Sequence, residues 1–273
     1  MVMQKTSRVA PHLVHRGAGF QDDQRNVPEE VAVAMSYNGT THAVMMATPA
    51  DLEDFGVGFS LTEGIITNVS EIEELNIEAY EKGIDVQIRL AEQPNERLAA
   101  RRRFMAGPVG CGLCGIDSID QALRPLTALA MDAVSFDARS IVAAMDALGK
   151  AQQLNSQTRA VHGAGFYVSG EGLFAAREDV GRHNALDKLI GALARADMSA
   201  EDGLVTITSR VSVEMVQKAV ILGVPVLAAI SAPTALAIRT AEEANLTLVA
   251  LVRGDEFNIY THPERIMEND RAS

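Results

Sequence analysis

The sequence is poor in cysteine and in positive charge, and it has no long apolar run. Only 2 cysteines occur among 273 residues, which excludes a scaffold held together by several disulfides. No stretch of 18 or more apolar residues is present, so the sequence predicts no membrane-spanning helix and no membrane partner. The 24 basic and 36 acidic residues give a net charge of −12. This charge argues against a nucleic-acid partner, because phosphate binding needs a basic face.

The rest of the composition is typical of a globular protein. Hydrophobic residues make up 47% of the chain, enough for the core of one large domain or two smaller ones. The N-terminus is polar and lacks the apolar core of a secretory signal peptide. We therefore expect a cytoplasmic location, where thiols stay reduced.

The first half of the chain predicts two hairpins and a helix. Asn38-Gly39 lies between two strand-like segments, and this dipeptide is the strongest short signal for a hairpin. A second hairpin is expected around Lys82-Gly83. Between them, Thr48-Pro49-Ala50-Asp51 predicts a helix start at which Thr48 supplies the cap.

The second half alternates apolar strands with amphipathic helices. Leu186, Leu189, Ile190 and Leu193 recur at the spacing of one helix face. Strands that alternate with helices predict a parallel sheet with right-handed crossovers. The expected strands cover residues 161–169, 173–176, 204–208, 226–230, 246–252 and 257–260.

This order of elements resembles the cytidine deaminase-like fold, a three-layer α/β/α arrangement around a mixed sheet. In that fold the first strand of the hairpin runs against the others. We expect this domain over residues 131–273, and a smaller N-terminal α+β domain with the cysteine loop over residues 27–130. Residues 1–26 show no apolar period and are expected to form a flexible arm. The analogy concerns the fold and not the function.

Four interpretations compete for Cys111 and Cys114. Burial as small apolar side chains is disfavoured by the surrounding glycines, which make the backbone open. A closed zinc site needs four ligands, and the sequence offers two thiolates and no His-x-x-x-His pair, so no structural metal is expected. A zinc deaminase needs thiols at a helix start in the second half, where none occurs. A thioredoxin-like pair would follow a strand rather than a glycine-rich loop.

Sulfur transfer is the fourth interpretation. A persulfide carrier needs an exposed thiolate in a positive field, and a second thiol nearby can resolve or accept the sulfur by exchange. A basic run precedes the pair, although such a run can also be a solvated helix face. The run consists of Arg97, Arg101, Arg102 and Arg103.

Longer motifs surround the cysteines and follow one another in a fixed order. They include Val27-Pro28-Glu29-Glu30-Val31, Gly58-Phe59-Ser60-Leu61-Thr62-Glu63-Gly64, Gly110-Cys111-Gly112-Leu113-Cys114-Gly115, Glu178-Asp179-Val180-Gly181-Arg182-His183-Asn184-Ala185-Leu186-Asp187-Lys188-Leu189 and Tyr260-Thr261-His262. With these motifs the chain resembles the FdhD/NarQ family, accessory sulfurtransferases that are required for active formate dehydrogenases. The resemblance spans roughly residues 27–265.

The resemblance implies an activity, a cofactor and partners. Such a protein takes persulfide sulfur from an IscS-like cysteine desulfurase and passes it to the molybdenum cofactor in its bis(molybdopterin guanine dinucleotide) form. Cys111 matches the usual carrier, with Cys114 as the second catalytic thiol. Formate dehydrogenase is the implied client, and a homodimer is the implied assembly. Many relatives carry Gly-Arg-Thr-Gly before the first cysteine, whereas this chain has Gly107-Pro108-Val109-Gly110, which shifts the expected anion-binding role to Arg101–Arg103.

A cofactor pocket is expected where the strands of the second half end. Ligands of open α/β sheets bind beyond the carboxyl ends of the strands, and free N–H groups at helix starts suit the diphosphates of a guanine dinucleotide. GDP should therefore bind as a fragment of the cofactor. Each residue of this pocket can instead be an ordinary cap or core hydrogen bond. The predicted contacts are Arg182, His183, Asn184, Ser209 and Arg210, and, by alignment with the family, the turn Leu251, Val252, Arg253, Gly254, Asp255 and Glu256.

Two functions from other classes remain open. A chaperone-like module would shield the cofactor without transferring sulfur, and it would tolerate serine at Cys111. A nucleotide hydrolase would use the helix starts, but the sequence has no P-loop and no evident acid/base pair.

Overall fold

The computed structural model describes residues 5–17, 19–95, 98, 126–130 and 134–268. The larger part of this structure is built on a six-stranded sheet with the order β13-β12-β11-β10-β8-β9. The strands β10, β11 and β12 are parallel, and β8 runs antiparallel to β10, as expected from the order of elements. The strands are β8 (His162–Val168), β9 (Gly172–Asp179), β10 (Gly203–Ile207), β11 (Val226–Ala229), β12 (Thr247–Arg253) and β13 (Glu256–Ile259).

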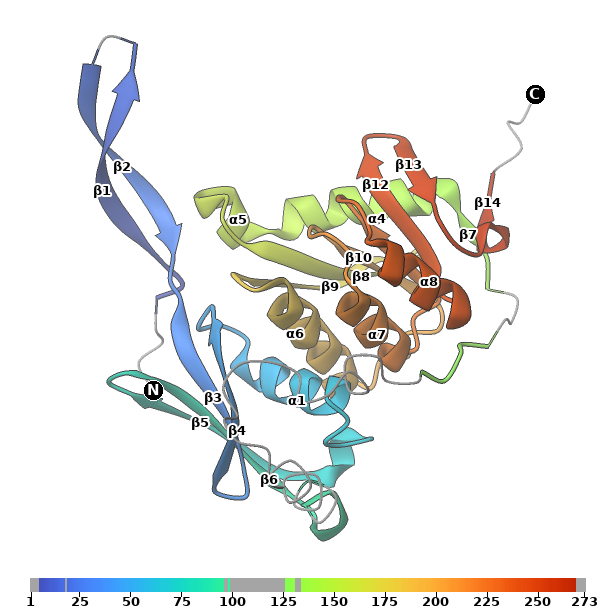
Figure 1. The fold of residues 1–273 in the computed structure, drawn as a ribbon, viewed down its shortest axis with the longest axis horizontal. Helices are drawn as coiled ribbons and strands as arrows, with labels where there is room; N and C mark the ends of the chain where they lie inside the picture. Colours follow the sequence, from blue (N-terminus) through green and yellow to red (C-terminus); the bar gives the residue numbers. More distant parts are fainter. Residues whose placement is uncertain (1–4, 18, 96–97, 99–125, 131–133, 269–273) are drawn as a thin grey trace.

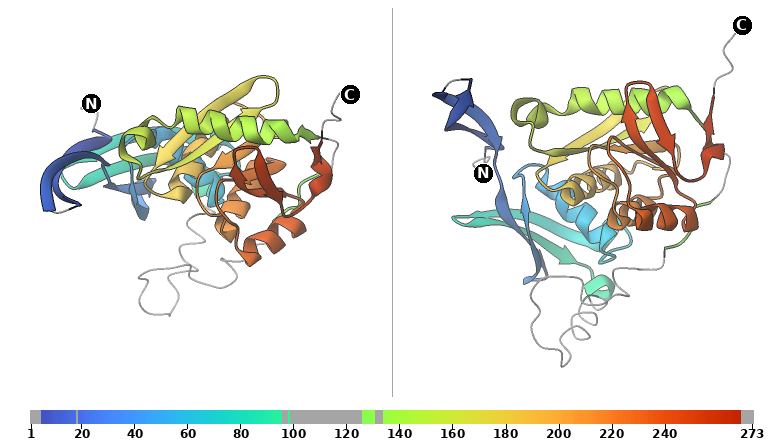
Figure 2. Two further views of the ribbon diagram at one scale, coloured as in Figure 1. Left: turned by 90° about the horizontal axis from the view of Figure 1, so that it is seen from above. Right: turned by 45° about the horizontal axis from the view of Figure 1, so that its top comes forward.

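Helices cover both faces of this sheet (Figures 1 and 2). One face carries α6 (Arg182–Arg195), α7 (Val213–Leu222) and α8 (Ala235–Glu243), and the other carries α4 (Ala138–Ala151), which is followed by α5 (Gln153–Thr158). The predicted apolar stripe of α6 is confirmed, because Leu186, Leu189, Ile190 and Leu193 are all buried in the core beneath it. Asp137 caps α4 by accepting a hydrogen bond of 2.8 Å from the Arg139 N–H.

The N-terminal half contains a four-stranded sheet with the order β4-β3-β6-β5. Both predicted hairpins are present in it. Asn38 and Gly39 have φ angles of 48° and 79°, the positive values that a tight two-residue hairpin turn requires. The elements are β3 (Val31–Tyr37), β4 (Thr40–Ala47), α1 (Leu52–Thr62), β5 (Ile72–Tyr80) and β6 (Gly83–Leu90).

Helix α1 joins the two sheets into one layered structure. One side of α1 packs on the four-stranded sheet through Phe55 and Phe59, and the other side crosses α6 (Figure 1). The crossing is so close that a Cβ built on Gly58 would lie 1.8 Å from the Asp187 carbonyl oxygen. A Cβ on Gly191 would lie 1.9 Å from the Asp54 carbonyl oxygen. Glycine at both positions lets the two backbones touch.

A flexible arm is predicted over residues 1–26, and the structure has regular strands in the part of it that is described. Residues 7–28 form an antiparallel hairpin of β1 (Ser7–Arg16) and β2 (Gly19–Pro28) that projects from the rest of the molecule (Figure 1). The sequence gives little signal for these strands because, among the described residues, they form a sheet of their own and bury little apolar surface. Near the base of the hairpin, the Arg25 guanidinium donates a hydrogen bond of 2.8 Å to the Thr158 carbonyl oxygen.

Two local expectations also change. Helix α1 begins after Asp51, which has a φ of 52° and makes no side-chain cap. The predicted cap, Thr48, instead forms hydrogen bonds with Asp179 of β9 and Lys188 of α6. The segment 126–130, expected in the N-terminal domain, packs on the C-terminal half: the Leu129 N–H donates to the Ala244 carbonyl oxygen at 3.0 Å. The two-domain division itself stays a prediction.

Short elements complete the described structure. Among the described residues, none of the helices has the length and apolar character to span a bilayer. The remaining elements are η1 (Val69–Glu71), β7 (Phe136–Asp137), η2 (Pro263–Arg265) and β14 (Ile266–Met267).

Candidate functional site

The two cysteines lie outside the described residues. The basic run and Gly107-Pro108-Val109-Gly110 lie outside them too. Sulfur chemistry at Cys111 and Cys114 therefore stays a prediction from the sequence. Among the described residues, no group of three or more His, Cys, Asp and Glu side chains is arranged to hold a metal ion.

The predicted helix starts come together at one edge of the six-stranded sheet. The loops after β10 and β11 touch, because the Val211 N–H donates to the Ala232 carbonyl oxygen at 3.2 Å and the Thr234 N–H donates to the Val211 carbonyl oxygen at 3.0 Å. The turn after β12 adjoins the second loop, with Leu251 N–H donating to the Ser231 carbonyl oxygen at 3.4 Å. Since parallel neighbouring strands end on the same side, this edge collects the three segments as expected.

The start of α6 reaches the same edge from the other side. Strand β9 is antiparallel to β8, which is antiparallel to β10, so β9 ends where β10 ends. The His183 imidazole from α6 faces Glu214 from α7, with 3.9 Å between Nε2 and the nearer carboxylate oxygen. That separation is too long for a hydrogen bond.

His183 is held neutral in this position. Burial, assisted by the charges of Arg182 and Lys218, lowers the pKa of His183 from 6.5 to about 4. Its Nε2 atom is buried and has no hydrogen-bond partner among the described residues. The pKa of the neighbouring His162 is also lowered, by burial and by the Arg182 charge. The edge therefore contains an uncharged imidazole.

Arg182 contributes a second unsatisfied group. Its Nε atom is buried without a hydrogen-bond partner among the described residues. An unpaired buried donor costs about 1–3 kcal/mol, and native proteins keep few of them. A ligand with phosphate oxygens would satisfy this donor with a charge-assisted hydrogen bond.

The remaining predicted residues divide into exposed and buried groups. Arg210, Arg253, Gly254, Asp255 and Glu256 are exposed at the edge. Ser209 is 3% exposed, and its hydroxyl donates to the Arg210 carbonyl oxygen at 3.0 Å. Val252 is 3% exposed and packs into the core on the α4 side, so only its backbone is available to a ligand.

Asn184 makes hydrogen bonds within the protein. Its Nδ2 donates to the Met46 carbonyl oxygen and to the Asp179 carboxylate, each at 2.9 Å. Both amide hydrogens are therefore used inside the protein. Its amide nitrogen thus faces the junction with β4, and a cofactor contact of Asn184 stays a prediction.

Comparison with known proteins places these features in a family. The model of the FdhD/NarQ family matches residues 28–267. The chain is 70% identical over 269 residues to a Sulfur carrier protein FdhD from Brucella abortus, covering 98% of this chain and 100% of the relative. It is 63% identical to the protein of the same name from Agrobacterium fabrum, covering 89% and 90%. The chain belongs to the FdhD/NarQ family.

A solved structure agrees with this assignment. The crystal structure of a formate dehydrogenase accessory protein from Desulfotalea psychrophila superposes with a TM-score of 0.76 at 28% sequence identity. The superposition covers 96% of this chain and 100% of the Desulfotalea psychrophila chain. The mixed α/β architecture with several sheets is therefore that of an FdhD/NarQ protein.

The longest family motif, residues 178–189, contains residues of the junction that the sequence analysis did not single out. Lys188 is fully buried and donates to the Asp179 carboxylate at 2.6 Å and to the Thr48 carbonyl oxygen at 2.9 Å. Lys218 from α7 donates to Asp187 and to the Thr62 hydroxyl, both at 2.8 Å. The ion pairs join α6 to β9 and to α7, and the hydrogen bonds from the same two lysines to Thr48 and Thr62 connect them to the N-terminal half of the FdhD/NarQ chain.

A signal for this junction is present in the sequence. Asn184, Asp187, Lys188, Gly191 and Arg195 follow one another at helical spacing, and they form a second stripe on α6 beside the apolar one. A polar stripe normally faces solvent. Here it faces α1, which only the position of the N-terminal half reveals.

Proposed function

We propose that this chain accepts sulfur as a persulfide on Cys111 and transfers it to the bis(molybdopterin guanine dinucleotide) molybdenum cofactor of a formate dehydrogenase. The observation that carries the proposal is full-length identity of 70% to a protein named as a sulfur carrier. The chain has only 2 cysteines, and both lie in one Cys-Gly-Leu-Cys motif. No other thiol is available to carry sulfur.

Loading is a thiol exchange reaction. The Cys111 thiolate attacks the terminal sulfur of a persulfide on a cysteine desulfurase. A new S–S bond forms at Cys111, the S–S bond of the donor breaks, and the donor cysteine leaves as a thiolate. The step involves no net oxidation, so it needs no further reagent.

Release of sulfide requires two electrons, and the second thiol provides a source for them. The Cys114 thiolate attacks the Cys111 sulfur of the persulfide and forms a disulfide. The terminal sulfur then leaves as hydrosulfide, which is a ligand for the molybdenum of the client. A dithiol reductant afterwards returns the pair to its reduced state.

The edge of the six-stranded sheet is the proposed binding surface for the client cofactor. The free Nε donor of Arg182 and the free nitrogen of the neutral His183 lie beside the starts of α6 and α7. Anionic diphosphates suit helix starts and arginine forks. The exposed turn with Arg253 and Asp255 follows β12 at the same edge, and a carboxylate there suits guanine. GDP, as a cofactor fragment, should bind at this edge.

Fold and partners complete the proposal. The layered C-terminal half has the strand directions expected for the cytidine deaminase-like fold, and we assign it to that fold. The proposed partners are a cysteine desulfurase as sulfur donor, formate dehydrogenase as client and a second copy of the chain.

Intact-mass analysis tests the sulfur step. After incubation with a cysteine desulfurase and cysteine, the wild-type chain should gain the mass of one sulfur atom, and Cys111→Ser should gain none. Cys114→Ser should still load sulfur but fail to release it. Equal loading of Cys111→Ser and wild type would contradict the carrier role and favour a chaperone that only shields the cofactor.

A further inference from the structure

The helix starts at the edge of the six-stranded sheet differ in what they offer to an anion. At the start of α8, the Thr234 hydroxyl accepts a hydrogen bond of 3.1 Å from the Ala237 N–H, so this start carries its own cap. At the start of α6, the N-cap residue is Gly181, which has no side chain, and the first turn contains no acidic residue. The start of α6 is therefore suited to an anion from outside the chain.

The start of α7 is different, because its first turn contains an anion of its own. Glu214 is the second residue of α7, a position where a carboxylate interacts favourably with the positive end of the helix. Burial alone would raise the pKa of Glu214, but interactions with the Ser212 side chain and with the Glu214 N–H outweigh burial and lower it. The charge of Arg182 acts in the same direction. The carboxylate thus occupies the environment that an external anion would seek at this helix start.

The contacts of the Glu214 carboxylate are weak enough to be exchanged. Its side chain is 41% exposed, and among the described residues it forms no salt bridge with a lysine or arginine. Lys218, one turn further along α7, donates instead to Asp187 and to the Thr62 hydroxyl, both at 2.8 Å. The nearer Glu214 oxygen lies 3.9 Å from the Nε2 atom of the neutral His183. The carboxylate can therefore rotate toward solvent without breaking a buried ion pair.

We propose that the Glu214 carboxylate is a built-in competitor for the anion position at the start of α7. It occupies this position in the free protein, and it moves aside when an anionic ligand binds across the starts of α6 and α7. This inference rests on the proposed function of the edge as the binding surface for the diphosphates of the client cofactor. Glu214 then sets the affinity of the edge for anions.

A competitor of this kind weakens binding without changing any contact of the bound state. The apparent dissociation constant equals the intrinsic constant divided by the fraction of molecules in which the position is free. If Glu214 covers the start of α7 in about nine of ten molecules, the affinity falls roughly tenfold. Weaker binding shortens the lifetime of the complex, which suits a protein that has to release the cofactor to its client.

A direct contact with the ligand is the alternative role for Glu214. A carboxylate accepts hydrogen bonds through two oxygens, and the guanine base offers two adjacent N–H donors. The position of Glu214 in the first turn of α7 favours the competitor, because its charge there already interacts with donors of its own chain. The two roles predict opposite changes in GDP affinity when the carboxylate is removed.

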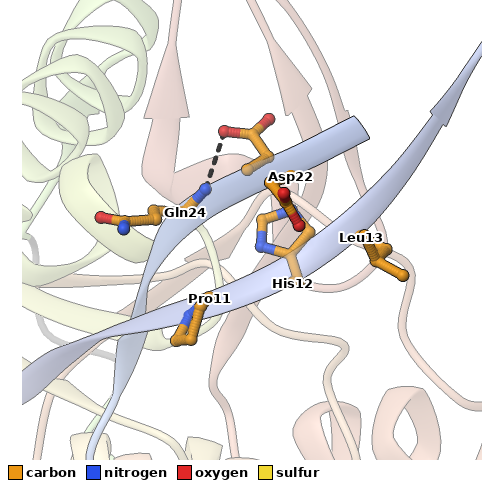
Figure 3. Close-up of a pocket in the computed structure, with 6 residues that line it drawn as sticks. Pro11, His12, Leu13, Asp22 and Gln24 are labelled. Carbon is orange, nitrogen blue, oxygen red and sulfur yellow. Dashed lines mark hydrogen bonds between the residues drawn. The ribbon is translucent and has the colours of Figure 1, made fainter. Parts of the chain in front are cut away.

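Inorganic pyrophosphate and GDP are the probes, because both contain the diphosphate group and only GDP contains the base. The chain has another hollow that a small probe can enter. It lies on the hairpin of β1 and β2, has a volume of about 490 Å³ and contains two carboxylates but no lysine or arginine (Figure 3). Anions are therefore not expected to bind in this hollow, which is lined by Pro11, His12, Leu13, Asp22, Asp23 and Gln24.

Calorimetry on the full chain tests the competitor. Glu214→Gln, which keeps the shape of the side chain, and Glu214→Ala, which removes it, should each bind pyrophosphate and GDP roughly tenfold more tightly than wild type. Glu243→Gln is the matched control. It removes the same charge at the exposed last residue of α8 and should leave both affinities unchanged. Circular dichroism identifies any variant that has lost its fold.

Each other outcome contradicts the competitor in a distinct way. Equal affinities of wild type and both Glu214 variants would show that the carboxylate does not compete. Weaker GDP binding with unchanged pyrophosphate binding would assign Glu214 to the base, and equal gains in Glu243→Gln would show a general effect of charge. In these cases GDP still binds to wild type, so the proposed pocket stands. Absence of binding to wild type and variants alike would overturn the pocket and the competitor together, while sulfur loading at Cys111 is measured separately by mass.

Discussion

Helix α6 meets two different environments within its first two turns. Arg182 and His183 have buried nitrogen atoms without hydrogen-bond partners among the described residues. Four positions after His183, Asp187 and the adjacent Lys188 are buried with nearly ideal ion-pair partners. The same helix therefore carries one group of polar residues that is satisfied by the fold and one that is not.

We expect the satisfied polar residues of α6 to contribute to stability and the unsatisfied ones to contribute to ligand binding. The satisfied group connects α6 to α1 and α7, and its removal would leave buried charges unpaired. The unsatisfied group lies at the start of α6, where His183 faces Glu214 at the start of α7. We expect substitutions in the first group to unfold the protein, and substitutions in the second to alter ligand binding with little effect on stability.

The largest effect should come from the crossing of α1 and α6. Gly191→Val places side-chain atoms where the Asp54 carbonyl oxygen already lies, so the helices must separate. We expect a loss above about 4 kcal/mol in the free energy of unfolding, measured by denaturant titration. Gly149→Ala, on α4 with no neighbour within 4 Å of the added Cβ, should be neutral or stabilising. Equal effects at both sites would show that the crossing is not tight.

The buried pair of Lys188 and Asp179 should have the next largest effect. Both side chains are 0% exposed, so Lys188→Met leaves a carboxylate buried without its cation. Breaking such a pair typically costs about 3–5 kcal/mol. Lys150→Met, on the exposed end of α4, serves as the control in the same thermal unfolding experiment. A variant as stable as the control would show that Asp179 is satisfied by its other donors.

A smaller, pH-dependent effect is expected for His183. Its pKa is lowered from 6.5 to about 4, so the unfolded state binds the proton more tightly. The stabilisation is complete above about pH 6.5 and is lost as the pH falls toward 4. The shift corresponds to about 3 kcal/mol, and because the side chain is 36% exposed we expect about 1–2 kcal/mol.

Denaturant midpoints at pH 7.5 and 4.5 measure this effect. Wild type should lose more stability between these values than His183→Gln, which has no proton to bind. Parallel losses in the two proteins would mean that His183 is solvated in the folded state. His162 shifts in the same direction, so the variant should retain part of the slope.

The smallest effect on stability, and the clearest on binding, is expected at the edge of the sheet. Arg210→Ala and Arg253→Ala change exposed side chains and should each weaken GDP binding roughly tenfold, about 1.4 kcal/mol, with unchanged unfolding. Calorimetry measures the affinity, which we expect to be micromolar. Arg139→Ala, on α4 across the sheet, is the control. Undetectable GDP binding to the wild-type protein would contradict the proposed cofactor pocket.

Local sequence signals predicted the elements whose geometry depends on few residues. The hairpin at Asn38-Gly39 needs only two residues that tolerate positive φ. The order of strands and helices in the second half followed from apolar periodicity, and the carboxyl ends of its parallel strands then had to meet at one edge. For the same reason, four of the predicted contacts, Arg182, His183, Arg210 and Arg253, lie at that edge.

Other features depend on residues far apart in the chain. The sequence predicts that Thr48 caps a helix, but its carbonyl oxygen accepts a hydrogen bond from Lys188 and its hydroxyl accepts one from the Val180 N–H. The sequence shows no apolar period over the hairpin of β1 and β2, because these strands pack mainly on each other. From the sequence, the polar stripe on α6 is predicted to face solvent, because the neighbouring residues give no sign that α1 covers it.

The sequence by itself determined the order of the elements, the family and the single pair of thiols. Turn residues, periodic apolar positions and motif identity are local properties, so they can be recognised from the sequence alone. The tertiary structure alone decided which polar residues of α6 are satisfied and which are free. That distinction depends on hydrogen-bond partners more than 100 positions away in the chain, and it separates the residues that hold the halves together from those proposed to bind a ligand.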